Sequence, residues 1–350
     1  MPQIDPNAIR QGDRLALSRA LTAAENGTPA SRDIQAALFP HTGKAHLIGI
    51  TGAPGTGKST LVNQLVKSFR KAENLPAPKV AVIAVDPTSP FTGGALLGDR
   101  IRMHDLAGDK DVFIRSMASR GALGGLAHST AAFATILDGA GFDLVLIETV
   151  GAGQAEVDIA RLAHTVIVVE APGLGDDIQA IKAGILEIAD ILVVNKSDQP
   201  GAENTARALQ AMLELSGSNT GSLFTAGKHR MQAQAPASLS PVNDEPAWKV
   251  PVLQVTATDG KGVLELREQI ETHRKYLLES GMWQVKENQR LKQDLDSLIS
   301  DLLVERWRQR QDKVAYHDAL KNVIERKWTP YEAAESLLKK SSIHSGIIVR

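Results

Sequence analysis

The run Gly52–Ser59, with the sequence GAPGTGKS, constrains the fold more than any other segment of the chain. It satisfies the pattern G-x-x-x-x-G-K-[ST], directly after the apolar run His46–Thr51 and directly before a helix-length stretch that starts at Lys58. In that context the glycines let successive backbone N–H groups point inward, and the helix adds its positive N-terminal end, so that phosphate oxygens bind there. The run therefore predicts a P-loop that binds a nucleoside triphosphate.

Each residue of this loop is a candidate nucleotide contact. Lys58 is expected to reach the β- and γ-phosphates and is a catalytic candidate, and the Ser59 hydroxyl is expected to ligate Mg²⁺. The predicted phosphate-binding residues are Gly52, Ala53, Pro54, Gly55, Thr56, Gly57, Lys58, Ser59 and Thr60.

Short apolar runs recur along the chain, and helix-length amphipathic stretches separate most of them. The runs VAVIAV, TVIVVE and ILVVN, at residues 80–85, 165–170 and 191–195, are largely continuous in their apolar character rather than alternating. Such runs are typical of strands that are covered on both faces, as in a parallel sheet flanked by helices. The sequence therefore predicts an α/β fold of the P-loop NTPase class, with a mostly parallel, doubly wound sheet whose ligands bind at the carboxyl ends of the strands.

The sequence NKSD at residues 195–198 follows one of these runs and predicts which base the nucleotide carries. The Asp198 carboxylate can accept hydrogen bonds from N1–H and the 2-amino group of guanine, whereas adenine would leave a buried carboxylate unpaired. Asn195 can bond the imidazole side of the base, and the Lys196 stem can lie over its face. The segment at the end of the last predicted strand is expected to bring a backbone amide against guanine O6, and its candidate residues are Thr256 and Ala257. This pattern favours GTP and GDP over ATP.

Two carboxylates close predicted strands at the edge where a cation beside a triphosphate needs oxygen ligands. Asp86 follows VAVIAV, and Glu148 follows LVLI. Mg²⁺ in such a site keeps several waters, so that one or two carboxylates suffice, directly or through water. Together with Ser59, these residues predict a magnesium site beside the phosphates.

The composition excludes several classes of protein. The 350 residues include 39 Lys and Arg and 40 Asp and Glu, a formal net charge of −1, so no charge excess favours nucleic acid or a membrane surface as partner. The absence of cysteine excludes disulfides, thiol catalysis and cysteine-based zinc sites. No apolar run approaches the roughly 18 residues needed to cross a bilayer, and the polar start lacks a signal-peptide pattern. We therefore expect a soluble, cytoplasmic protein.

Both ends of the chain fall outside the alternation of strands and helices. Residues 1–42 predict a helical extension that includes one helix over Ala8–Glu25, and residues 284–350 predict a helical C-terminal arm. Between them, residues 43–283 form the predicted P-loop domain, with a proline-rich flexible insertion at 217–249. Four leucines of the arm repeat at 4-3-4 spacing, which suits either a dimerisation seam or a helix packed on its own domain: Leu291, Leu295, Leu298 and Leu302.

Several longer motifs carry a family resemblance. They are DPTSPFTGGALLGDRIRM at 86–103, IRSM at 114–117, ETVGAGQ at 148–154 and PGLGDDIQAIK at 172–182, together with the P-loop and NKSD. On these motifs the chain resembles the MeaB/ArgK group of GTPases, within the SIMIBI class of P-loop proteins. The insertion at 217–249 is the main departure from that group.

The resemblance assigns roles to the matched positions. Asp99 and Arg102 fall in switch I of the group, the segment that rearranges around the γ-phosphate, and Asp99 is a further metal-binding and catalytic candidate. Glu148, also a catalytic candidate, begins switch II, and residues 172–182 resemble the third switch. Because phosphoryl transfer is accelerated by neutralising charge on the phosphate oxygens, Arg102 is the candidate cis arginine and Lys182 is a supporting cation.

The resemblance also implies a biological role. It implies a GTP-hydrolysing metallochaperone that binds an adenosylcobalamin-dependent acyl-CoA mutase, gates its cofactor loading and protects or reactivates it. Methylmalonyl-CoA mutase is the default client, and relatives such as 2-hydroxyisobutyryl-CoA mutase use related helpers. We expect slow intrinsic hydrolysis, because the partner is needed to order the switch loops, and a homodimer formed through the C-terminal helices.

Four other functions stand as alternatives. A nickel-insertion GTPase would need Cys and His ligands, which the absence of cysteine and the nine scattered histidines disfavour. A ParA-like positioning ATPase conflicts with NKSD at 195–198. An amino-acid transport-associated kinase of the ArgK type would lack a membrane segment and a visible phosphoacceptor. A non-enzymatic dimeric scaffold is disfavoured by the presence of four candidate site residues: Lys58, Ser59, Asp86 and Glu148.

Overall fold

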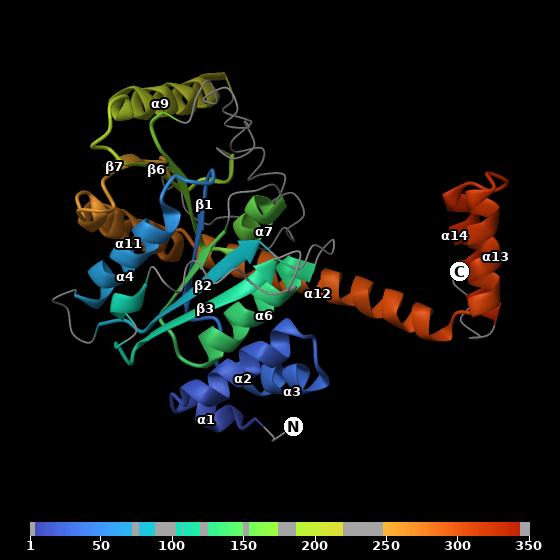
Figure 1. Cartoon of the computed structure of the whole chain (residues 1–350). Coiled ribbons are helices and arrows are strands. Elements are labelled where there is room, and N and C mark those ends of the chain that lie inside the picture. The colour runs from blue at the N-terminus through green and yellow to red at the C-terminus, as the bar shows by residue number, and fades with distance from the viewer. Residues whose placement is uncertain are drawn as a thin grey trace. The chain divides into compact units, whose positions relative to one another are not determined.

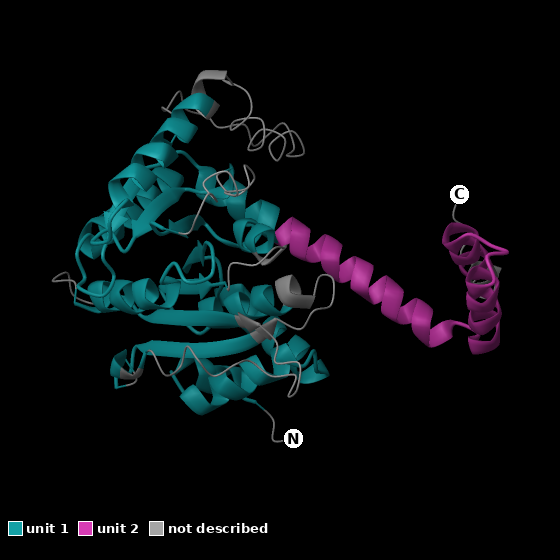
Figure 2. Ribbon diagram, turned by 45° about the horizontal axis from the view of Figure 1, so that its top comes forward, with its two compact units in different colours: residues 1–290 teal, residues 291–350 magenta. Residues whose placement is uncertain are grey.

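The computed structural model describes residues 4–71, 77–87, 103–106, 108–119, 125–149, 154–173, 187–219 and 248–343. The chain divides into two compact units, unit 1 (Met1–Arg290) and unit 2 (Leu291–Arg350), which Figure 2 shows in different colours. Within the described ranges, unit 1 contains all of the strands, and unit 2 is helical. The predicted domain boundaries at 42/43 and 283/284 stay predictions.

Among the described residues, seven strands form one sheet at the centre of unit 1 (Figure 1). The strand order is β3-β2-β4-β1-β5-β6-β7, and each adjacent pair is parallel. The strands are β1 (His46–Thr51), β2 (Val80–Pro87), β3 (Val112–Ser119), β4 (Leu144–Glu148), β5 (Thr165–Glu170), β6 (Ile191–Asn195) and β7 (Val252–Val255). The predicted α/β class with a parallel P-loop NTPase sheet is confirmed.

Helices precede, follow and connect these strands. In unit 1 they are α1 (Pro6–Arg10), α2 (Arg14–Glu25), α3 (Pro29–Leu38), η1 (Phe39–His41), α4 (Lys58–Arg70), η2 (His104–Leu106), α6 (Gly125–Gly139), α7 (Gln154–Leu162), α9 (Ala202–Asn219) and α11 (Val263–Glu279). Helix α12 (Met282–Arg310) begins in unit 1, and unit 2 continues with α13 (Lys313–Ile324) and α14 (Pro330–Ile343). These helices confirm the predicted helical extensions at both ends of the sheet domain.

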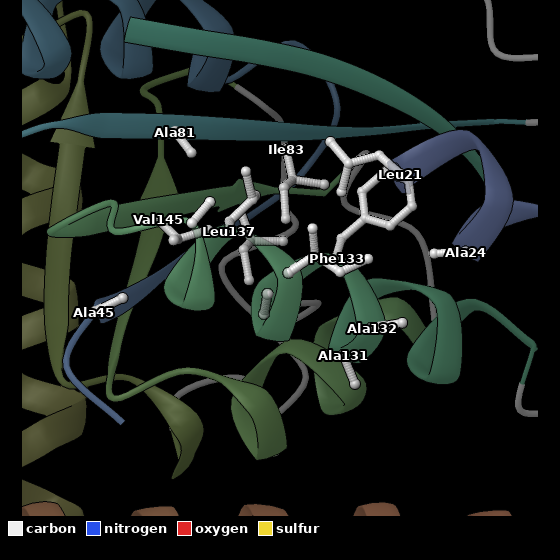
Figure 3. Packing of buried hydrophobic residues seen from close by; sticks show 14 of the residues in the cluster. Leu21, Ala24, Ala45, Ala81, Ile83, Ala131, Ala132, Phe133, Leu137 and Val145 are labelled. Carbon is white, nitrogen blue, oxygen red and sulfur yellow. The ribbon is translucent and has the colours of Figure 1, made fainter. Parts of the chain in front are cut away.

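Helices cover both faces of the sheet, which explains why the strands are apolar along their length. On one face, α4 and α11 bury side chains of the central strands. On the other face lie α6, α7 and α9. Figure 3 shows part of that second face, where Phe133 and Leu137 of α6 pack against Ile83 of β2 and Val145 of β4. Each such fully buried side chain contributes about 1.5–3 kcal/mol.

The N-terminal extension contains a break that the sequence analysis did not predict. The expected single helix over Ala8–Glu25 is instead two helices, α1 and α2. Gly12 between them has φ +91°, which ends the first helix. The Asp13 side chain then caps α2, because its Oδ1 accepts hydrogen bonds from the N–H groups of Leu15 (2.8 Å) and Ala16 (3.0 Å). Helices α2 and α3 pack on α6 beside the sheet.

A buried polar network fastens α11 and the first turns of α12 to the amino ends of β1 and β5. Thr165 Oγ1 lies 2.7 Å from His46 Nε2 and 2.8 Å from His273 Nδ1. Asp190 Oδ1 lies 3.6 Å from His273 Nε2, and Asp190 Oδ2 accepts from Lys286 Nζ at 3.2 Å. Burial lowers the pKa of His46 well below its usual value. The network therefore anchors these helices at the amino ends of the strands, opposite to the carboxyl ends where the glycine-rich loop follows β1.

Unit 2 consists of the rest of α12 with α13 and α14. Helices α13 and α14 pack on each other and, with α12, line an apolar groove of about 470 Å³. Its lining residues are Leu303, Val304, Trp307, Tyr316, Ala319, Leu320, Val323, Pro330, Ala333, Ala334, Leu337 and Leu338. In the described part of the chain, none of the helices is both long and apolar enough to cross a membrane.

Candidate nucleotide-binding site

The glycine-rich loop between β1 and α4 has a backbone that only glycine fits at two positions. Gly52 has φ +137°, and a Cβ atom there would lie 2.0 Å from the Val169 carbonyl oxygen. Gly57 has φ +89°, and a Cβ atom there would lie 2.5 Å from Asn195 Nδ2. The loop therefore packs closely against the ends of β5 and β6, as a P-loop at the carboxyl edge of a parallel sheet requires.

The Lys58 side chain folds back into this loop. It is 6% exposed, and its Nζ donates to the carbonyl oxygens of Gly52 (2.8 Å) and Ala53 (2.9 Å). Thr56 Oγ1 also donates to the Ala53 carbonyl, at 2.9 Å. The Lys58 ammonium thus lies inside the loop whose phosphate ligand it is predicted to contact.

A serine and a carboxylate meet at the predicted magnesium site. Ser59 Oγ donates to Glu148 Oε1 at 2.6 Å, and the Glu148 side chain is buried at 5% exposure. Glu148 ends β4, where it pairs with Ile50 of β1 and Ala84 of β2. Next to it, Thr149 N–H donates to the Ile50 carbonyl at 3.0 Å. The site therefore offers two adjacent oxygen donors, the ligand type that Mg²⁺ prefers.

One buried amide joins the P-loop to the loops that follow β6 and β7. Asn195 Nδ2 donates to the Thr56 carbonyl at 2.7 Å, and Asn195 Oδ1 accepts from the Ala257 N–H at 3.1 Å. The Asn195 residue is 2% exposed. The NKSD motif predicts a contact between Asn195 and the base. In the structure the Asn195 side chain bridges two distant backbone groups, a position that sequence spacing does not indicate.

The loop that carries NKSD is held in a defined conformation. Lys196 has φ +56°, an uncommon conformation for a residue other than glycine. Ser197 N–H donates to the Val255 carbonyl at 3.1 Å, and the hydroxyls of Ser197 and Thr256 lie 2.9 Å apart. Asp198 is exposed beside them. The predicted base-binding residues Asn195, Lys196, Asp198, Thr256 and Ala257 therefore lie on two adjoining loops.

Glu170 is a residue of this edge that the sequence analysis missed. It is the last residue of β5, in the run TVIVVE between the P-loop strand and the NKSD strand. Its pKa is raised to about 7, chiefly because burial disfavours the charged carboxylate. The charge that ends this apolar run was the signal that could have identified it.

Other predicted site residues lie outside the described part of the structure. They are Asp99, Arg102 and Lys182, together with the side chain of Asp86. The backbone of Asp86 is described, and it extends β2 by two residues beyond Ala84, the partner of Glu148. The roles of these residues stay predictions.

Comparison with known proteins shows to which family the chain belongs. The family model described as "Methylmalonyl Co-A mutase-associated GTPase MeaB" matches residues 17–312. The chain belongs to the MeaB family of GTPases.

Relatives of this MeaB-family protein extend over most of its length. A protein of Pyrococcus abyssi that carries the name of a GTPase is 42% identical over 332 residues, which cover 95% of this chain and 94% of the relative. The mouse protein "Methylmalonic aciduria type A homolog, mitochondrial" is 28% identical over 347 residues, with 94% of this chain and 77% of the relative covered. As a GTPase, the MeaB-family chain binds guanine nucleotides.

A solved structure agrees with this assignment. A crystal structure described as a LAO/AO transport system kinase superposes with a TM-score of 0.65 at 26% identity, and it covers 95% of both chains. The resemblance to the MeaB/ArgK group is thereby confirmed.

The bridge made by Asn195 gives the first prediction. Asn195→Ala leaves the Thr56 carbonyl and the Ala257 N–H without their partner, and each buried unsatisfied group costs about 1–3 kcal/mol. We expect the affinity for GDP, measured by isothermal titration calorimetry, to fall by about 10- to 100-fold. Asn204→Ala, at an exposed position of α9, is the matched control and should bind GDP like the wild type. An unchanged GDP affinity of Asn195→Ala would contradict the bridging role.

Proposed function

We propose that this MeaB-family GTPase is a GTP-hydrolysing metallochaperone of an adenosylcobalamin-dependent acyl-CoA mutase. It gates cofactor loading and protects or reactivates the mutase. The observation that carries the nucleotide half of the proposal is the Asn195 bridge, because it unites a phosphate loop and a base loop at one edge of the sheet. The observation that supports the client is the description of the matching family, which names methylmalonyl-CoA mutase.

In this proposal, the residues at the carboxyl edge of the sheet have separate roles in binding phosphate, base and metal. Lys58 and the backbone N–H groups of the loop hold the phosphates, and the loops around Asn195 and Ala257 hold the guanine. Ser59 and Glu148 would hold Mg²⁺, with Asp86 and Asp99 as further candidates. When bound, the ion would neutralise part of the negative charge on the phosphate oxygens. Two cations assigned from the family resemblance would stabilise the charge that develops in transfer: Arg102 and Lys182.

Low intrinsic activity is expected where the charge-stabilising residues belong to segments that a partner has to order. By the family resemblance, the two predicted cations Arg102 and Lys182 belong to such switch segments. A partner that orders the switch segments would complete the remaining charge-stabilising contacts. We therefore propose that hydrolysis is slow in the isolated chain and that the mutase stimulates it.

The identity of the client rests on the names of relatives. The family description names methylmalonyl-CoA mutase, and the mouse relative is named for methylmalonic aciduria. Methylmalonyl-CoA mutase is therefore the first client to test, followed by related enzymes such as 2-hydroxyisobutyryl-CoA mutase.

A transport-associated kinase is the second candidate function. It is favoured by the description of the superposed crystal structure as a LAO/AO transport system kinase. In that case the chain would transfer the γ-phosphate of a nucleotide to another protein instead of to water. Release of inorganic phosphate in the absence of any phosphorylated protein separates hydrolysis from kinase activity.

The second prediction tests the client directly. The GTPase rate of the full chain is measured with and without each adenosylcobalamin-dependent mutase of the same organism. With the true client we expect the rate to rise by about tenfold or more, which corresponds to a barrier lowered by about 1.4 kcal/mol. Lys58→Ala should abolish hydrolysis in both conditions, because it removes the cation that contacts the phosphates.

A negative result with every candidate mutase would overturn the proposed chaperone function. If none of the organism's cobalamin-dependent mutases forms a complex with the chain or changes its GTPase rate, the chaperone function is wrong. In that case, GTP hydrolysis that the wild type shows and Lys58→Ala lacks would still establish that the chain is a GTPase.

We further propose that unit 2 forms a homodimer. Its groove exposes large apolar side chains, with Leu303 at 62%, Val304 at 48% and Leu338 at 54% exposure. Two of the four leucines at 4-3-4 spacing are also exposed, Leu295 at 57% and Leu298 at 38%. A second copy of unit 2 would remove this apolar surface from water.

The third prediction concerns that dimer. Leu303→Asp combined with Leu338→Asp places two charges in the groove and should convert a dimer to a monomer in sedimentation velocity experiments. Leu278→Asp, on α11 of unit 1 and similarly exposed at 55%, is the matched control and should stay dimeric. A monomeric wild type, or a double variant that sediments like the wild type, would contradict the proposal.

A further inference from the structure

Two buried threonines lie at the carboxyl ends of β1 and β4, next in sequence to the predicted phosphate loop and metal ligand. Thr51 is the last residue of β1 and directly precedes Gly52, and Thr149 directly follows Glu148. Both threonines are buried. The Thr149 hydroxyl donates to Thr51 Oγ1 at 3.0 Å. A buried side-chain bond therefore joins the residue after the predicted metal ligand to the residue before the glycine-rich loop.

Thr149 is bonded to β1 through its backbone as well. Its N–H donates to the Ile50 carbonyl at 3.0 Å, and Ile50 is also the ladder partner of Glu148. The backbone bonds between β4 and β1 therefore continue one residue past the end of β4. Together with the bond to Thr51, they fix Thr149 to the strand that leads into the glycine-rich loop.

The backbone between Glu148 and Thr149 is held from both faces of the sheet. Along β1, Ile50 points into the buried cluster on the α4 side, and because side chains alternate along a strand, Thr51 points to the opposite side. On the α4 side, the Glu148 carboxylate accepts from Ser59 Oγ at 2.6 Å. On the opposite side, Thr149 bonds Thr51. The two bonds together fix the Glu148 carboxylate beside Ser59.

The bonds of Thr149 use none of the atoms that would bind a metal ion. The predicted ligand atoms belong to Ser59 and Glu148, whereas Thr149 donates through its own N–H and hydroxyl to β1. These bonds can therefore stay in place when an ion binds. Because Mg²⁺ demands a nearly ideal ligand geometry, groups that fix the position of a ligand affect metal affinity strongly.

We propose that Thr149 and Thr51 are a positioning pair of the metal site, which holds the Glu148 carboxylate in place for Mg²⁺. Neither threonine is a predicted ligand of the ion, so the pair acts through Glu148. The inference rests on the metal site of the proposed function and is independent of the mutase and of the dimer.

The test is the binding of Mn²⁺ to the GDP complex of the full chain, followed by the loss of the electron paramagnetic resonance signal of free Mn²⁺. Mn²⁺ takes the same oxygen ligands as Mg²⁺. Thr149→Val keeps the shape of the side chain and removes its hydroxyl, and we expect the dissociation constant of Mn²⁺ to rise by about tenfold. Thr149→Ser keeps the hydroxyl and should bind Mn²⁺ like the wild type.

Two further measurements separate positioning from a merely structural role. In EDTA, without a metal ion, Thr149→Val should bind GDP with the affinity of the wild type in isothermal titration calorimetry. Its GTPase rate should be low at limiting Mg²⁺ and should recover as the Mg²⁺ concentration is raised. A general distortion of the site would instead lower the GDP affinity in EDTA, and Mg²⁺ would not restore the rate.

The partner residue and a matched control make the result specific. Thr51→Val removes the acceptor of the same bond, so it should raise the dissociation constant of Mn²⁺ as Thr149→Val does. The double variant should be no weaker than either single variant, because both changes remove one shared bond. Thr205→Val, which removes a buried hydroxyl that donates to the Gly201 carbonyl at the start of α9, should bind Mn²⁺ like the wild type.

Wild-type Mn²⁺ affinity in Thr149→Val, or an equal loss of affinity in Thr149→Ser, would overturn the inference and leave the proposed function intact. If Thr149→Val does not fold, Thr51→Val decides in the same way. If neither single variant folds, the double variant decides, because it leaves neither hydroxyl without its partner. A wild type whose GDP complex binds no Mn²⁺ would overturn both the inference and the metal site on which it rests.

Discussion

The buried amide of Asn195 is the contact on which the rest of the nucleotide site depends. Its two ends bond backbone groups of residues that are far apart in sequence, Thr56 in the P-loop and Ala257 after β7. Gly57 leaves the space for this amide, since a Cβ atom there would lie 2.5 Å from its nitrogen. The glycine of one motif and the asparagine of another are therefore required by the same close contact. That contact holds the predicted phosphate loop and the predicted base loop next to each other.

Two charged side chains of the edge already bond protein groups in the structure. Lys58 bonds carbonyls of its own loop, and Glu148 accepts from Ser59. A nucleotide and a cation that bind at this edge would therefore exchange existing interactions for new ones. Strand β5 extends from this edge to the buried network at Thr165, so that one strand connects the nucleotide site with the anchor of α11 and α12.

Local patterns predicted much of this molecule, and long-range contacts account for what they missed. The P-loop and the parallel sheet follow from glycine spacing and from apolar runs, both of which are local. The bridging role of Asn195 was not predictable, because its partners come from two other strand ends. The break at Gly12 and Asp13 was missed because a turn inside an amphipathic stretch keeps the apolar period on both sides. The pKa of Glu170 depends on burial that exists only in the folded chain.

Whether this edge of the sheet is a guanine site is tested most directly by the base specificity of the loop that carries NKSD. Calorimetry of Asp198→Asn with GDP and with xanthosine diphosphate measures it. The asparagine amide donates where the carboxylate accepted, so it matches the 2-oxo group of xanthine in place of the 2-amino group of guanine. We predict a GDP affinity about tenfold or more below that of the wild type, and a preference of the variant for xanthosine diphosphate. An Asp198→Asn variant that keeps the GDP affinity and selectivity of the wild type would contradict the account.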